Sequence, residues 1–138
     1  MKNIMVSVMT CLLLFSLVHT NPADARDPKQ DYVGTWLRIE KYADNSPLPV
    51  KETSIMVLTK TTFSAESKGV PGAECKNSGE LAVNNNKMVM TVKASTCPSI
   101  INVGSKVAFT YSLSLDKSFL TIINTEWGYT YKEVLKRQ

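Results

Sequence analysis

The stretch Val107-Ala108-Phe109-Thr110-Tyr111-Ser112-Leu113-Ser114-Leu115 decides the class of fold. Large apolar side chains occupy every second position of this run, and small or polar residues occupy the positions between them. Because successive side chains of a β-strand point to opposite faces of a sheet, the alternation predicts a strand with one packed and one solvated face. Residues 88–94 repeat the pattern, and one face there is expected to carry Met88, Met90, Val92 and Ala94.

On either side of these runs, short segments rich in β-branched and aromatic residues alternate with turn residues at a spacing of about ten. No stretch keeps the apolar period of about 3.6 residues that marks a helix. This spacing predicts an all-β sandwich or barrel. The predicted strands are 34–42, 53–60, 61–68, 73–83, 87–96, 106–115, 118–125 and 128–136.

Turn-forming residues separate the predicted strands. The segment 45–49 is expected to be a loop because it holds two prolines, which do not suit a sheet interior. Asn84-Asn85-Asn86 is expected to form a hairpin turn because Asn tolerates a positive φ. Residues 98–105 make a longer connection, in which Ile100 and Ile101 are expected to be exposed.

The first 25 residues have the features of a secretory signal peptide. Lys2 gives a positive start, an apolar centre follows, and Ala23-Asp24-Ala25 places small residues where signal peptidase cleaves. The apolar run is shorter than the roughly 20 residues of a spanning helix, so no membrane span is expected. Lipidation at Cys11 is not expected, because a lipobox has its apolar run before the cysteine, whereas the leucine run here follows Cys11.

Cleavage after Ala25 would leave a flexible lead-in at 26–33 and one domain at 34–138, in the periplasm or secreted. The net charge of +4 comes from scattered Lys and Arg residues, which favours solubility. Nucleic-acid binding would need a clustered basic stripe, so no nucleic-acid partner is expected. We expect a monomer.

Two cysteines, Cys75 and Cys97, remain in the mature chain, and in an exported protein such a pair predicts a disulfide. The register supports this pairing. If Cys75 and Cys97 face each other across an antiparallel hairpin, its centre falls at Asn86, within the predicted turn. The closed loop is short, and the chain-entropy model gives it about 3 kcal/mol of stabilisation.

Most enzyme chemistry is excluded by composition. The single histidine, His19, lies in the leader, which removes histidine-dependent triads and histidine metal sites from the mature domain. No glycine-rich phosphate loop is present. A carboxylate pair among Glu66, Glu74 and Glu80 is disfavoured, since Glu66 and Glu80 are expected to face solvent. We therefore expect no catalytic residues, metal or cofactor, and a protein that is not an enzyme.

Gly34-Thr35-Trp36 at the start of the first predicted strand resembles the lipocalin-like (calycin) families, in particular small exported bacterial members. The closing segment 128–134 and the segment 109–116 are similar to the same families. The resemblance implies a small antiparallel up-and-down β-barrel of about eight strands. It also implies that Trp36 plugs the closed end, covered by a basic residue that is either Lys132 or Arg137. The Cys75…Cys97 pattern is more weakly similar to the META-domain proteins.

The resemblance implies a binding function, and two hypotheses follow. In the first, the barrel holds a small hydrophobic ligand. Its apolar ring would contain Leu81 and the residues Met88, Met90, Phe109, Tyr111 and Leu113, with Ile100 and Ile101 forming a lip. The same residues would otherwise be a packed core, and the shortness of the chain favours a filled interior over a cavity.

In the second hypothesis, the domain is a protein-binding module, such as an inhibitor of a protease or lysozyme. Such a protein needs a rigid loop and no cavity. The candidates are residues 26–33 and the loop 44–50, where Pro47 and Pro49 restrict the backbone. Trp127, beside a predicted turn, is either a contact residue or folded back on the rim.

Overall fold

We describe the fold from a computed structural model, which covers residues 30–72 and 74–138. The predicted leader and residues 26–29 of the predicted lead-in lie outside these residues. The described part contains nine β-strands in one sheet. They are β1 (Gly34–Ala43), β2 (Ser46–Leu48), β3 (Thr53–Leu58), β4 (Thr62–Lys68), β5 (Cys75–Asn84), β6 (Lys87–Ser95), β7 (Lys106–Leu113), β8 (Phe119–Asn124) and β9 (Tyr131–Arg137).

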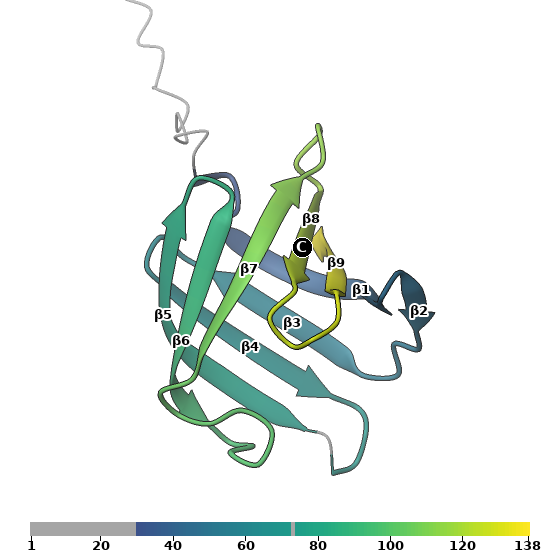
Figure 1. The fold of residues 1–138 in the computed structure, drawn as a ribbon, viewed down its shortest axis with the longest axis vertical. Coiled ribbons are helices and arrows are strands. Elements are labelled where there is room, and N and C mark those ends of the chain that lie inside the picture. Colours follow the sequence, from purple (N-terminus) through teal and green to yellow (C-terminus); the bar gives the residue numbers. More distant parts are fainter. Residues whose placement is uncertain (1–29, 73) are drawn as a thin grey trace, which may run out of the picture.

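Eight of these strands close into an antiparallel up-and-down barrel (Figure 1). Each strand from β3 onward pairs with the next, β1 pairs with β3 at one edge, and β1 pairs with β9 at the other. The all-β barrel with one disulfide is therefore confirmed, and it is consistent with a calycin-like fold. Within the described residues, no helix has the length and apolarity needed to cross a bilayer.

Two predicted details of the strands are wrong. The segment 45–49, expected to be a loop, contains the short strand β2, which pairs with the end of β1. Proline is tolerated there because β2 lies at the sheet edge and needs hydrogen bonds on one side only. The predicted strand 106–115 ends at Leu113, so Leu115 lies in the β7–β8 turn and is fully exposed instead of packed.

The β5–β6 hairpin carries a β-bulge that decides which side chains face inward. Asn84 pairs with Lys87 around the turn, but the register shifts by one residue between Ser78 and Gly79. The extra residue in β6 reverses the alternation, so Ala94, expected on the packed face with Met88, is exposed. The same shift brings Cys97 opposite Cys75, and their Cα atoms lie 5.4 Å apart in the disulfide.

The up-and-down topology sends alternate connections to opposite ends of the barrel. The turns 59–61, 85–86 and 114–118 lie at one end, which we call the closed end. The connections 44–52, 96–105 and 125–130 lie at the other end, and we call these three connections the open-end rim. The β4–β5 connection also leaves this second end.

Gly79 should be intolerant of any side chain. A Cβ atom at this position would lie 1.9 Å from the carbonyl oxygen of Thr91 and 2.9 Å from the backbone nitrogen of Lys93. We expect Gly79→Ala to lower the free energy of unfolding by about 2 kcal/mol or more, because the bulge must shift. Urea unfolding measures this. The control Ser78→Ala should stay within about 0.5 kcal/mol. Equal stabilities of the two variants would contradict the assigned register.

Candidate functional site

The closed end is sealed by Trp36, which is fully buried. Its indole Nε1 donates a hydrogen bond of 2.8 Å to the carbonyl oxygen of Tyr32, in the turn that crosses this end. The Arg137 guanidinium lies over the indole, 4.2 Å from the ring centroid. Stacking of a cation on the indole face adds an electrostatic attraction to the packing. Trp36 therefore has the plugging position that the resemblance implied.

Arg137, and not Lys132, is the basic residue at the plug. Its guanidinium donates to the carbonyl oxygens of Val33 (3.0 Å), Asp31 (2.5 Å) and Lys117 (3.0 Å), so one side chain ties the N-terminal turn to the β7–β8 turn. At Gly34 a Cβ atom would lie 2.6 Å from Arg137 Nη1, and the φ of +153° also favours glycine at this position. Lys132 lies elsewhere, with its Nζ 3.9 Å from the ring centroid of Tyr42.

The middle of the barrel is filled by apolar side chains. Met88 and Leu120 are 0% exposed, Ile122 is 1% exposed and Met90 is 5% exposed. A cavity large enough for a ligand would leave accessible surface on the side chains that line it, so these values indicate a packed core. The other buried members of the core are Tyr32, Trp36, Leu58, Phe63, Leu81, Val92 and Leu135.

The residues predicted to line a ligand cavity divide into three groups. Leu81, Met88 and Met90 are core residues. The side chains on the inward face of β7 are only partly buried and pack against that core, as does the lip residue Ile101. These β7 residues are Phe109, Tyr111 and Leu113. Ile100, the other lip residue, is 66% exposed. The structure thus brings most of the predicted ring together, but these side chains belong to the packed core or pack against it.

Above the core, toward the open end, the inward face becomes charged. Arg38 donates to Glu133 Oε1 at 2.7 Å and is also paired with Glu52. Lys41 Nζ lies 2.9 Å from Glu52 Oε1, and the Tyr131 hydroxyl donates to Glu133 Oε1 at 2.7 Å. The side chains of Arg38 and Glu133 are each only 10% exposed. We call these five residues the polar layer.

Burial and neighbouring charges shift pKa values within the polar layer. Burial alone would raise the pKa of Glu52, but the hydrogen bond from Lys41 and the charges of Arg38 and Lys41 outweigh it, so the pKa is lowered. Burial raises the pKa of Tyr131, and the charge and hydrogen bond of Glu133 raise it further. Because the pKa of Glu52 is lowered and the pKa of Tyr131 is raised, Glu52 stays ionised and Tyr131 stays protonated at neutral pH.

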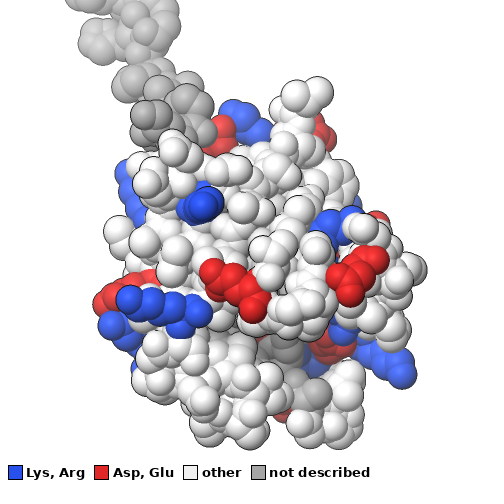
Figure 2. All heavy atoms as spheres, in the orientation of Figure 1, with Lys and Arg blue, Asp and Glu red and all other residues white. Residues whose placement is uncertain are grey.

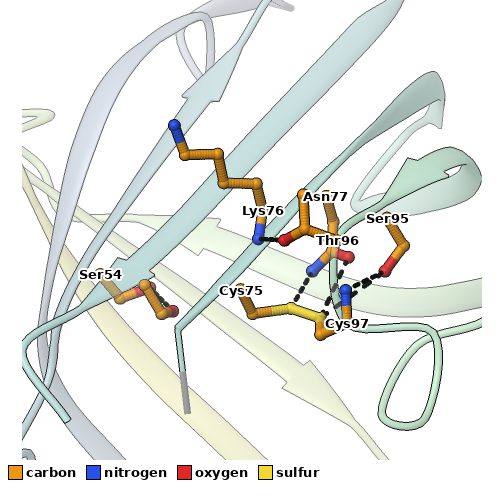
Figure 3. The surroundings of a disulfide bond; sticks show 8 residues. Ser54, Cys75, Lys76, Asn77, Ser95, Thr96 and Cys97 are labelled. Atoms are coloured by element: carbon orange, nitrogen blue, oxygen red, sulfur yellow. Dashed lines mark hydrogen bonds between the residues drawn. A yellow bond between two sulfur atoms is a disulfide. The ribbon is translucent and has the colours of Figure 1, made fainter. Parts of the chain in front are cut away.

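The opposite wall at the same level carries the disulfide and small polar side chains (Figure 3). Asn77 Nδ2 lies 3.3 Å from Cys75 Sγ, and Ser95 Oγ accepts a hydrogen bond of 3.2 Å from the Cys97 backbone nitrogen. Ser67 Oγ donates to Ser54 Oγ at 3.1 Å on the neighbouring strands. The end of the barrel through which an apolar ligand would have to enter is therefore lined by polar groups on both walls.

The open-end rim, by contrast, exposes large apolar side chains. Ile100 and Val103 are 66% and 60% exposed, and Trp127 and Tyr129 are 47% and 41% exposed. The β6–β7 connection has no charged residue from Cys97 to Ser105. Figure 2 shows this region, at the lower left of the view, as mostly white, whereas the charged atoms lie over other parts of the same face.

Two depressions lie on the outside of the barrel. One, of about 540 Å³, is at the closed end between Asp31, Arg137 and the β7–β8 turn. The other, of about 420 Å³, crosses the outer faces of β3 to β6, where Val57, Ser64, Ser78 and Ala94 form one cross-strand row. Glu66 borders this depression and pairs with Lys68 and Lys76, so it faces outward as predicted.

Within residues 30–72 and 74–138, no three His, Cys, Asp or Glu side chains are grouped so that they could hold a metal ion. Comparison with models of known protein families and with curated protein sequences finds no match.

Sequence reasoning missed the polar layer. No role was predicted for Arg38 or Glu133, although alternation from Trp36 to Arg38 and from Arg137 back to Glu133 already places these side chains on the inward face. Lys41 and Glu52 carried no comparable signal. Lys41 follows a second register shift, between Arg38 and Glu40, and Glu52 lies in the β2–β3 connection.

We expect Arg38→Met to destabilise the barrel strongly. Removing this guanidinium leaves Glu133 without its cationic partner and Glu52 with Lys41 alone, in a site shielded from water, and breaking such a pair typically costs about 3–5 kcal/mol. Urea unfolding provides the measurement. The matched control is Lys93→Met, which breaks the exposed pair between Lys93 and Glu80 and should cost less than about 1 kcal/mol. Equal losses in the two variants would show that the polar layer is solvated.

Proposed function

We propose that this protein is an exported, non-enzymatic binding protein of the lipocalin-like type that meets its target with the open-end rim. The barrel is then a rigid scaffold and not a container. The observation that carries this proposal is the contrast between the packed interior, where Met88 and Leu120 are 0% exposed, and the exposed apolar side chains of the rim.

Export is supported by two features. The leader residues have the order of a signal peptide, and the Cys75–Cys97 disulfide suits an oxidising compartment. We place the mature protein in the periplasm or outside the cell. The absence of histidine after His19 supports a role without catalysis.

The two sequence-based hypotheses differ in the surface that binds. A module that binds a protein, such as an inhibitor of a protease or lysozyme, would use a rigid surface, and the rim supplies one. A small hydrophobic ligand would have to pass the polar layer and displace the core, at the cost of leaving buried polar groups without partners. The partial burial of Phe109, Tyr111 and Leu113 favours this ligand as the second candidate.

Native mass spectrometry separates the two candidates. The mature protein, purified gently from its own compartment, should give the mass of the bare chain with one disulfide, because the interior has no room for a guest. The same mass should be found after extraction with organic solvent. A bound mass that disappears on extraction would overturn the proposal and establish an interior lipophilic ligand.

A further inference from the structure

The exposed apolar side chains of the described residues gather at one end of the barrel. Eight large hydrophobic residues are exposed, and five of them belong to the open-end rim. Two more, Ile55 and Val57, lie on the outer wall, and one, Leu115, is at the closed end. The five rim residues are Leu48, Ile100, Val103, Trp127 and Tyr129.

The β6–β7 connection holds its apolar side chains outward in a fixed conformation. The backbone nitrogen of Ile100 donates to the carbonyl oxygen of Cys97 at 2.9 Å, and that of Gly104 donates to the carbonyl oxygen of Val92 at 2.8 Å. The disulfide ties the start of the connection to β5. A connection held in this way cannot fold Ile100 and Val103 back onto the core, so both stay in water unless a partner covers them.

The β8–β9 connection presents aromatic rings at the same end. Trp127 lies 6.3 Å from the ring of Tyr129 and 5.4 Å from the ring of Tyr131, measured between centroids. Thr130 and Asp44 exchange two hydrogen bonds of 2.8 Å, which join this connection to the turn before β2. Trp and Tyr have an apolar ring and a polar atom, a combination that suits the boundary between lipid and water.

We propose that the open-end rim docks on the surface of a lipid bilayer with zwitterionic headgroups. This inference rests on the proposed function and names the target of the same rim. The apolar groups come from three separate connections, and a fluid bilayer accepts such groups without matching their shape. A protein partner would need a fitted contact for each of them.

Charge favours zwitterionic over anionic lipid. Glu52 is paired inward, which leaves Asp44, Lys51 and Glu126 as the exposed charged residues of the rim. This balance offers no net attraction to an anionic headgroup, so the contact should depend on buried apolar area. We therefore expect binding that changes little between low and high salt.

The two tryptophans make the test direct. Trp36 is 0% exposed and should be silent, whereas Trp127 is exposed and should report contact with lipid. Mature protein titrated with phosphatidylcholine vesicles should show a blue shift of its fluorescence, quenching by brominated acyl chains, and sedimentation with the vesicles. Each signal should persist at high salt.

Matched variants identify the surface. Ile100→Asn/Val103→Asn keeps the Trp127 reporter and should lower the vesicle partition coefficient by about tenfold or more, because two apolar side chains no longer enter lipid. Leu115→Asn removes an apolar side chain at the closed end that is more exposed than Ile100 or Val103, and it should have no effect. An equal loss in both variants would overturn the assignment to the rim.

The outcomes also separate this inference from the proposed function. No binding to vesicles by a protein whose native mass is that of the bare chain would overturn lipid docking while leaving a rim that binds a protein. A lipophilic guest found by native mass spectrometry would instead overturn the proposed function itself.

Discussion

The pairing of the first strand with the last is the constraint on which the rest of the molecule depends. β1 and β9 pair from Trp36 with Arg137 to Ala43 with Tyr131, and this seam closes the sheet into a barrel. At one end of the seam the guanidinium of Arg137 covers the indole of Trp36. Toward the other end, where Arg38 lies opposite Leu135 in the strand register, the Arg38 side chain forms an ion pair with Glu133. Closure thus also fixes the plug and the polar layer.

A barrel of this size has an interior that side chains alone can fill. The core residues take the middle, the plug takes one end, and the polar layer and the disulfide wall take the other. Binding inside would require an apolar guest to break ion pairs that are shielded from water. Binding at the rim requires no such change, because the apolar side chains there are already exposed and their connections are held by backbone hydrogen bonds.

Local alternation and the position of turns were sufficient to predict the all-β class and the strands other than β2, and the two cysteines of an exported chain predicted the disulfide. The up-and-down barrel itself came from the family resemblance. The Trp36 plug came from the resemblance of Gly34-Thr35-Trp36 to a family. The β-bulge at Gly79 was not predictable, because one extra residue reverses the inward face without changing composition, and it moved Ala94 outward. The hairpin is centred between Asn85 and Asn86, and not at Asn86 as the register argument assumed. The extra residue of the bulge offsets this difference, so Cys97 still lies opposite Cys75.

The candidate site was harder to predict than the fold. The predicted ligand ring relied on apolar residues of one strand face, but the same residue types line a cavity and fill a core, and only packing distinguishes them. The polar layer was missed because it joins β1, β9 and the β2–β3 connection, which are remote in sequence. Trp127 was recognised, with its role left open, because exposure depends on how the connection folds.

Methyl NMR of the three methionines in the mature chain tests most directly whether the barrel is a scaffold or a container. Met88 and Met90 lie in the core and Met56 packs against it, while the Trp127 indole marks the rim. Mature protein labelled at the methionine methyl groups and at the tryptophan indole nitrogens is titrated first with a fatty acid and then with lipid nanodiscs. We predict that the methionine signals stay in place throughout and that the Trp127 indole signal moves with nanodiscs. Saturable shifts of Met88 and Met90 with the fatty acid, with Trp127 unchanged, would contradict the account.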